Sequence, residues 1–471
     1  MVFGNSAFNF FCLVCIVVSQ ATVCDATFDI IDPEVQNVNM SKLETSALRM
    51  ATPRAMSVPQ LAAYQSFIRR LKNNQRVSAV ALGGSCIVGI GCTEWAGKER
   101  QCAFPSRFYR WLSMKHYGRK DGVKYENRAV GATTTAANLP MLPMLVADTM
   151  EGSANHTRGV DMVFVDFSIN DESVSNDVLR IKNASFLRYE KVLAATEAAV
   201  RYILEFHPDT AILLMDGGCR SHKANAAHQA VASLYGIAYV RKCTPGFHFS
   251  ASEHETVKES MVEWWNVFEK AVTDVKLRGS VTSDTQLPSP PRDPITPANL
   301  AAYFVVCAKP LTVYDAKDAY FGNGSAPTVI KGDWSLELDR NRTDKASWTS
   351  YIDKSVVNFP LKFGKIPQIA IVFTKGYDDT FGAVKVTMLG TSLTRTILQG
   401  CCDPNNVTQS ELRILHVGEA PRFRRLSDIT RNSREGYQER YRLLPHSSVT
   451  MQVTFLKESY SKFSIKHVAS C

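Results

Sequence analysis

The chain has 471 residues, of which 45% are hydrophobic and 21% are charged, and its formal net charge is +9. This composition excludes a disordered chain and is typical of a globular protein long enough for two domains. The charge is modest for the length, so it argues against nucleic-acid binding and indicates at most a mild attraction to anionic surfaces or glycans.

The N-terminal segment has the layout of a secretory signal peptide. The apolar run Phe8–Val18 is followed by small and polar residues, so we expect residues 1–26 to be a signal peptide that is cleaved between Ser19 and Ala26. No Lys or Arg precedes the run, which leaves an uncleaved anchor as the alternative, although the run is short for a bilayer. No later segment predicts a stable membrane span. The expected location is secreted, the secretory-pathway lumen or the cell surface.

Two further features favour export. Six Asn-x-Ser/Thr sequons are potential glycosylation sites, namely Asn39, Asn155, Asn183, Asn323, Asn341 and Asn406. Outside the leader, no two of the twelve cysteines form a C-x-x-C pair, so disulfides are expected and a metal site is not. Cys86, Cys92 and Cys102 lie close together in the sequence, and a bridge among them would stiffen the turn that they surround.

In chain order, residues 27–59 lack periodicity and are expected to form an N-terminal arm. Residues 60–280 alternate short apolar runs with helical patterns, which predicts βαβ units around a five-stranded parallel sheet. The expected strands are 77–82, 124–130, 162–167, 211–215 and 237–240. The expected helices are 60–71, 105–117, 184–206, 225–235 and 257–277.

The C-terminal part has a different pattern. Residues 281–299 are rich in Pro, Ser, Thr and Asp, which indicates a linker. Residues 300–471 contain short alternating runs separated by turns, which predicts an antiparallel β-sandwich. The segment Arg422–Arg442 holds seven arginines and is either an anion-binding segment or a solvated loop. Four aromatic residues could stack on sugars or fill the core of this domain: Trp334, Trp348, Tyr351 and Tyr377.

Small or polar residues follow four of the expected parallel strands. Ser85 follows the first strand at a glycine turn, Gly131 follows the second, Asn170 the third and His248 the fifth. The carboxyl ends of parallel strands share one edge of the sheet, where ligands bind, so we expect these four residues to lie together. Taken alone, Ser85 could equally be the cap of a short helix.

Four segments in this order resemble the sequence blocks of the SGNH (GDSL-like) hydrolases, which are esterases with a flavodoxin-like α/β/α fold. The segments are GGSCIVGIGC, NRAVGATT, SIND and HFSASEH, and HQAVASLYGIAYV is similar to the helix–strand unit before the histidine block of extracellular members. The resemblance covers residues 60–280. It implies that Ser85 is the nucleophile and His248 its base. It also implies an oxyanion hole made by the backbone N–H groups of Ser85 and Gly131 and the side-chain amide of Asn170.

The chain departs from this family at three positions. Gly84 stands where many members have Asp, which is not a catalytic residue. Ser168 stands where a Gly is usual, so the wall beside Asn170 is expected to be tighter. Pro245 stands three residues before His248, where the family has the acid of its triad.

The sequence therefore leaves open which group orients His248. A backbone carbonyl near Pro245 could orient the imidazole in a Ser–His dyad, which we favour, or Glu253 or Asp216 could supply a carboxylate from the same edge. His254 is the alternative base, but we interpret it as a packing residue at the start of the last helix.

Three other polar residues are interpreted as structural. His228 lies on the apolar face of its helix and is expected to be a core histidine, while Asp166 and Asp171 are expected to accept hydrogen bonds. The chain has no G-x-S-x-G segment, which excludes the nucleophile elbow of α/β-hydrolases.

Three functions stay open at this point. The first is a serine esterase that removes acetyl or similar short acyl groups from an acylated glycan or small ester, without a cofactor. The second is an O-acyltransferase that uses the same serine. The third is a catalytically inactive glycan-binding protein at the cell surface. Polysaccharide binding by the C-terminal domain is expected only by analogy with other esterases that carry a β-sandwich.

Overall fold

The computed structural model describes residues 49–50, 56–95, 97–147, 159–171, 184–218, 222–244, 248–275, 310–339, 342, 345–364, 367–376, 380–391, 396–401, 408–416, 446–456 and 462–471. The predicted signal peptide, most of the N-terminal arm, the predicted linker and the segment Arg422–Arg442 lie outside these ranges. Asn323 is the sequon asparagine inside them, and it is exposed.

The first folded domain is built on a sheet with the strand order β1-β6-β5-β4-β2-β3. Strands β2 to β6 pair in parallel, and β1 pairs antiparallel with β6. The five parallel strands have the flavodoxin-like order, which confirms the fold class predicted from the sequence. The strands are β1 (Arg49–Met50), β2 (Val77–Gly83), β3 (Val123–Asn127), β4 (Met162–Asp166), β5 (Ala211–Gly218) and β6 (Ala238–Thr244).

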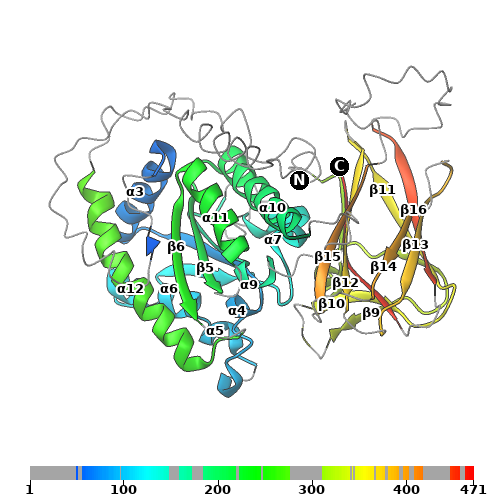
Figure 1. Ribbon diagram of the computed structural model, residues 1–471, viewed down its shortest axis with the longest axis horizontal. Coiled ribbons are helices and arrows are strands. Elements are labelled where there is room, and N and C mark those ends of the chain that lie inside the picture. The colour runs from blue at the N-terminus through cyan, green and yellow to red at the C-terminus, as the bar shows by residue number, and fades with distance from the viewer. Residues whose placement is uncertain are drawn as a thin grey trace, which may run out of the picture. The chain divides into compact units, whose positions relative to one another are not determined.

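Helices cover both faces of this sheet (Figure 1). One layer consists of α3 (Val58–Lys72), α6 (Phe104–Tyr117) and α12 (Ala251–Asp274), and the other contains α10 (Ala184–Phe206) and α11 (His222–Tyr235). Aromatic rings from the first layer interlock, as in the perpendicular pairs Tyr64–Phe268 and Phe67–Trp265. The short helices are α4 (Ser85–Val88), η2 (Thr93–Trp95), α5 (Glu99–Cys102), α7 (Thr135–Asn138), η3 (Leu139–Met141), α8 (Leu142–Leu145) and α9 (Ser168–Asp171).

Helix α12 begins six residues earlier than periodicity predicts, at Ala251 instead of Val257. The reason is a capping box, in which the Ser250 side chain accepts a hydrogen bond from the Glu253 backbone N–H and the Glu253 carboxylate accepts one from the Ser250 backbone N–H. The sequence SASE already contains this signal, which apolar spacing alone misses.

The second folded domain is an antiparallel β-sandwich, as the sequence predicts. One sheet has the order β15-β12-β17-β10-β9, with β7 also paired to β17, and the other has the order β14-β13-β16-β11-β8. Helix α14 (Ala316–Tyr320) follows β7. The strands are β7 (Thr312–Asp315), β8 (Thr328–Lys331), β9 (Ser335–Leu338), β10 (Ala346–Ser350), β11 (Val356–Lys362), β12 (Gln368–Lys375), β13 (Ala383–Met388), β14 (Thr396–Gln399), β15 (Gln409–His416), β16 (Ser448–Leu456) and β17 (Phe463–Ser470).

The tryptophans proposed for sugar stacking in this domain belong to its core, whereas Tyr320 and Phe321 are exposed and pack against each other. Trp334 and Trp348 are only 6% and 4% exposed and belong to the sandwich core. Tyr351 is partly exposed, and its hydroxyl donates a hydrogen bond to Glu337. Tyr377 lies outside the described residues.

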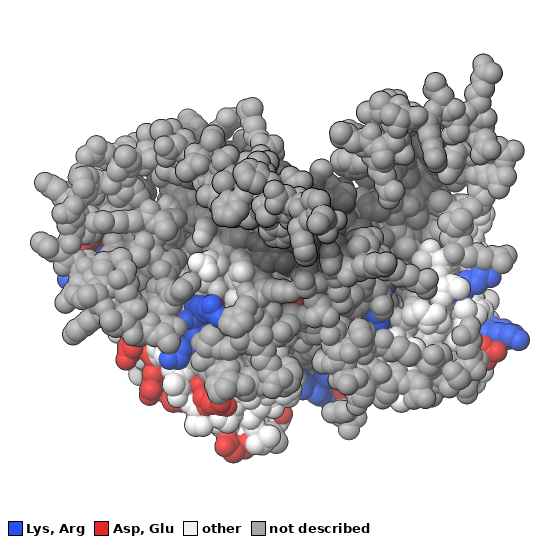
Figure 2. All heavy atoms as spheres, viewed as in Figure 1, with Lys and Arg blue, Asp and Glu red and all other residues white. Residues whose placement is uncertain are grey.

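The described surface carries charges of both signs. Basic and acidic side chains occur on the same face of the molecule (Figure 2). Within the described ranges, no helix combines the length and the apolar character needed to cross a membrane.

Candidate active site

The turn after β2 places Ser85 at the carboxyl edge of the sheet. All seven residues of β2 are buried, so the strand is fixed between its neighbours and its end has a defined position. Gly84 precedes the short helix α4, and Ser85 is the first residue of that helix. The helix ends after one turn at Gly89, whose φ of 87° is accessible to glycine at little cost. The Ser85 side chain is therefore held on a tight strand-to-helix turn.

His248 lies between β6 and α12, and its imidazole faces this serine. The distance from His248 Nε2 to Ser85 Oγ is 3.0 Å, which is hydrogen-bonding distance for a base and its nucleophile. Partial burial lowers the pKa of His248 from its ordinary value. The imidazole is therefore neutral at neutral pH and can accept the serine proton.

The backbone beside His248 is packed against the loop after α4. A Cβ atom on Gly91 would lie 2.1 Å from the carbonyl oxygen of Phe249 and 3.0 Å from the carbonyl carbon of His248. Phe249 is itself fully buried and packs against Phe104. Glycine at position 91 thus allows the serine turn and the histidine segment to touch through their backbones.

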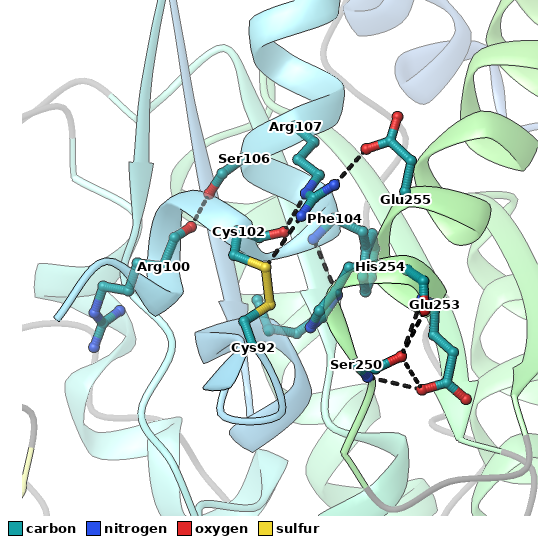
Figure 3. Close-up of a disulfide and its surroundings, with 12 residues drawn as sticks. Cys92, Arg100, Cys102, Phe104, Ser106, Arg107, Ser250, Glu253, His254 and Glu255 are labelled. Carbon is teal, nitrogen blue, oxygen red and sulfur yellow. Dashed lines mark hydrogen bonds and ion pairs between the residues drawn. A yellow bond between two sulfur atoms is a disulfide. The ribbon is translucent and has the colours of Figure 1, made fainter. Parts of the chain in front are cut away.

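A disulfide lies next to the same turn, as the clustering of cysteines predicts. Cys92 is bonded to Cys102, at the end of α5 (Figure 3). The Arg107 side chain donates to the Cys102 carbonyl and forms an ion pair with Glu255 on α12. Cys86 remains a buried thiol, and burial raises its pKa. The bridge and the ion pair connect the serine turn to helices of the first layer.

His254 is a packing residue, which agrees with its predicted role. Its Nδ1 accepts a hydrogen bond from the backbone N–H of Phe104 at 3.2 Å, and its ring stacks on the Phe104 ring (Figure 3). Burial lowers the pKa of His254 to about 4, so the ring stays neutral over most of the pH range. Both observations leave His248 as the histidine that contacts Ser85.

Gly131 and Asn170, the other two predicted oxyanion donors, also lie at this edge. The loop that carries Gly131 is joined to β2 by a hydrogen bond from the Val130 N–H to the Gly83 carbonyl. Asn170 lies in α9, directly after β4, and is buried. The carboxyl ends of β2, β3 and β4 are neighbours in the sheet, so the structure brings the three segments together.

Gly84 has a role that the sequence did not reveal. A Cβ atom on residue 84 would lie 1.9 Å from Oδ1 and 3.0 Å from Cγ of Asn170. The Asn170 carboxamide therefore occupies the space that any other side chain at position 84 would need. The glycine at position 84 therefore bears directly on the placement of Asn170, a predicted oxyanion donor.

The two carboxylates proposed as alternatives for the triad acid are engaged elsewhere. Glu253 caps α12 through Ser250. Asp216 is fully buried and pairs with His228 and Tyr239. Among the described residues, no carboxylate is hydrogen-bonded to His248, and Pro245 lies outside them. Among the described residues, the pair that could activate a nucleophile is therefore Ser85 and His248.

A buried polar network connects to the segment that carries Asn170. His228 contacts Asp216 through Nδ1 and Asp171 through Nε2, so it is a buried histidine whose partners are both carboxylates. Asp166 accepts hydrogen bonds from the N–H and hydroxyl of Ser168. Burial and the neighbouring Asp216 raise the pKa of Asp166 to about 7. Asp166 and Asp171 are hydrogen-bond acceptors, as predicted.

Comparison with known proteins gives the fold. No protein-family model and no curated protein matches the chain. Among solved structures, the chain is similar to a two-domain esterase (CEX) active on acetylated mannans, with 13% identity over 87% of this chain and 95% of that chain and a TM-score of 0.53. The structure of a two-domain esterase (CEX) active on acetylated mannans, co-crystallized with mannopentaose, is also similar. It gives 14% identity over 89% of this chain and 97% of that chain, with a TM-score of 0.53. The chain has the same two-domain fold, in agreement with the SGNH-type α/β domain and appended β domain predicted from the sequence.

Proposed function

We propose that this protein is an SGNH-type serine esterase that removes acetyl or other short acyl groups from glycans in the secretory pathway or outside the cell. The observation that carries the proposal is the 3.0 Å contact between Ser85 Oγ and His248 Nε2, at a sheet edge that also holds Gly131 and Asn170. A two-domain fold shared with an esterase active on acetylated mannans supports a glycan ester as the substrate.

The chemistry follows from these groups. Ser85 Oγ attacks the ester carbonyl carbon while His248 Nε2 takes the hydroxyl proton. The oxyanion of the tetrahedral intermediate would accept hydrogen bonds from the backbone N–H groups of Ser85 and Gly131 and from the Asn170 amide. The intermediate collapses when His248 returns its proton to the departing sugar oxygen. Water, deprotonated by His248, then attacks the acyl-enzyme, which releases the carboxylic acid and restores the serine hydroxyl.

The described residues favour a Ser–His dyad. A carboxylate at Nδ1 would orient the imidazole and stabilise the imidazolium that forms during the reaction. No carboxylate among the described residues takes this place, so the orientation of His248 would come from its backbone, which is held by the buried Phe249 and by the contact with Gly91. We propose that this backbone packing supplies the orientation that the family's acid would give.

The pH dependence of catalysis tests the state of His248. Only neutral His248 accepts a proton, and partial burial lowers its pKa from 6.5, so the active form persists as the pH falls. We expect kcat/KM for a short acetyl ester to be constant at neutral pH and to decline only below 6.5. A profile recorded from about pH 4 to about pH 9 measures this. A midpoint above 6.5 would contradict the dyad, because a carboxylate partner raises a histidine pKa.

The function itself is tested by fluorophosphonate labelling of the purified full-length protein, followed by peptide mapping. We expect one adduct on Ser85, which is lost in His248→Ala, and release of acetate from acetylated mannan. Transfer of the acyl group to an added glycan without acetate release would indicate the acyltransferase. No adduct on folded protein, together with binding to the polysaccharide, would indicate the inactive glycan-binding protein.

A further inference from the structure

The buried histidine of the first domain is held between two carboxylates. His228 is 4% exposed, and its Nδ1 lies 2.6 Å from Asp216 Oδ1 while its Nε2 lies 3.0 Å from Asp171 Oδ2. Asp171 and Asp216 are 1% and 0% exposed. Burial alone would lower the pKa of His228, but the two carboxylates outweigh it and raise this pKa to about 10. Both ring nitrogens therefore carry protons and donate to carboxylates.

One of these carboxylates, Asp171, connects the segment that carries Asn170 with the segment that carries Gly131. Asp171 follows Asn170 directly in α9. Its Oδ1 accepts a hydrogen bond from the Thr135 backbone N–H at 2.8 Å, and its Oδ2 accepts one from the Thr135 hydroxyl at 2.6 Å. Thr135 begins α7, in the loop that also contains Gly131. The side chain of Asp171 thus fixes the β4 end and the β3 end of the site relative to each other.

The other carboxylate anchors the histidine in the core. Asp216 lies near the end of β5, and its Oδ2 accepts a hydrogen bond from the Tyr239 hydroxyl at 2.5 Å. Asp166 is its acidic neighbour and is held by Ser168 and by the backbone N–H of Gly217. His228 therefore lies between two buried carboxylates, and an uncharged residue at this place would remove the positive charge that both Asp171 and Asp216 contact.

We infer that His228 is a positioning residue of the oxyanion hole: its imidazolium fixes Asp171, and Asp171 fixes the placement of Asn170 relative to Gly131. This inference rests on the proposed function. His228 does not touch the substrate and transfers no proton. Since oxyanion donors act mainly in the transition state, loss of the imidazolium lowers kcat and leaves KM nearly unchanged.

The test compares His228→Gln with His207→Gln in the full chain. His207 is also a buried histidine, 8% exposed, but it lies at the end of α10 beside Gly159, ahead of β4. We expect His228→Gln to lower kcat for an acetyl ester about 10- to 10²-fold, with KM within about twofold, and the rate of Ser85 phosphonylation to fall by a similar factor. His207→Gln should leave kcat, KM and the labelling rate unchanged. Equal kinetic effects of the two substitutions on folded protein would overturn the inference.

A second measurement does not depend on activity. In protein labelled with ¹⁵N at histidine, asparagine and glycine, His228 should show imidazolium nitrogen shifts at neutral pH. His228→Gln should move the Asn170 side-chain and Gly131 backbone resonances, and His207→Gln should not. A neutral His228, or unmoved Asn170 and Gly131 signals in folded His228→Gln protein, would refute the inference. If the wild-type protein neither hydrolyses esters nor labels at Ser85, the proposed function fails, while these signals still decide the positioning role.

If the His228→Gln variant does not fold, the Tyr239→Phe variant is used for the same measurements. This substitution removes only the hydroxyl that donates to Asp216 and keeps all buried charges. We expect a smaller decrease of kcat, about twofold to tenfold, again with unchanged KM, and a smaller displacement of the Asn170 signal in the same direction. No change of the kcat or of the Asn170 signal in this variant would count against the network.

Discussion

Replacing Ser85 with alanine is expected to lower kcat for a short acetyl ester by at least about 10²-fold without unfolding the protein. The size of the loss reports on the orientation of His248. In a full triad, removing the serine costs roughly 10⁶-fold in kcat, whereas removing the acid alone costs roughly 10⁴-fold, so a dyad has about 10²-fold left to lose. Burst and steady-state kinetics on acetylated mannan and on a small acetyl ester measure this.

The matched control is Ser260→Ala, because Ser260 is partly exposed on α12 and its hydroxyl contacts only the Thr256 carbonyl among the described residues. It should retain full activity. A loss near 10⁶-fold for Ser85→Ala would show that a further group stabilises the His248 imidazolium and would contradict the dyad. Full activity of Ser85→Ala would show that Ser85 is not the nucleophile and would refute the proposed function.

Replacing Gly84 with alanine is expected to lower kcat about 10²- to 10³-fold, the usual effect of losing one oxyanion donor. The added Cβ would lie 1.9 Å from Asn170 Oδ1, so the carboxamide must leave its position. Gly84 has φ −88° and ψ −153°, which alanine also adopts, so backbone strain is not the cause. Steady-state kinetics and thermal unfolding of the same sample separate displacement of Asn170 from loss of the fold.

A double-mutant cycle with Asn170→Ala identifies the path of this effect. With no carboxamide at position 170, an alanine at position 84 has room, so the double variant should be no less active than Asn170→Ala alone. Fully additive losses would contradict the role of Gly84 as the space for Asn170. Gly364→Ala is the control, because a Cβ there meets its nearest atom, a backbone carbon of Cys471, at an ordinary 3.4 Å.

Sequence patterns predict much of this molecule because the responsible forces are local. Apolar runs that end at glycine or polar residues indicate the buried parallel strands. The order of those strands along the chain then brings Ser85, Gly131, Asn170 and His248 to one sheet edge. Alternation beyond residue 300 predicts the sandwich in the same way. The capping box at Ser250 and Glu253 is equally local and was available in the sequence.

The remaining features depend on residues that are distant in the sequence. The need for glycine at position 84 is visible only when Asn170 fills the space beside it. From the sequence, His228 is interpreted as an ordinary core histidine, because its partners Asp171 and Asp216 follow or end two other strands, β4 and β5. Likewise, the sequence leaves Glu253 and Asp216 as candidates for the triad acid. The structure shows that Glu253 binds Ser250 and that Asp216 binds His228 and Tyr239.

The contact of Gly91 with Phe249 also has a consequence for thermal behaviour. Phe249 is fully buried against Phe104 and lies beside Gly217, so the histidine segment separates from the serine turn only if a core aromatic ring is withdrawn. We therefore expect local fluctuations to leave Ser85 and His248 in contact. On heating, the Ser–His pair should persist until the first domain melts as a whole, and inactivation and unfolding should share one temperature.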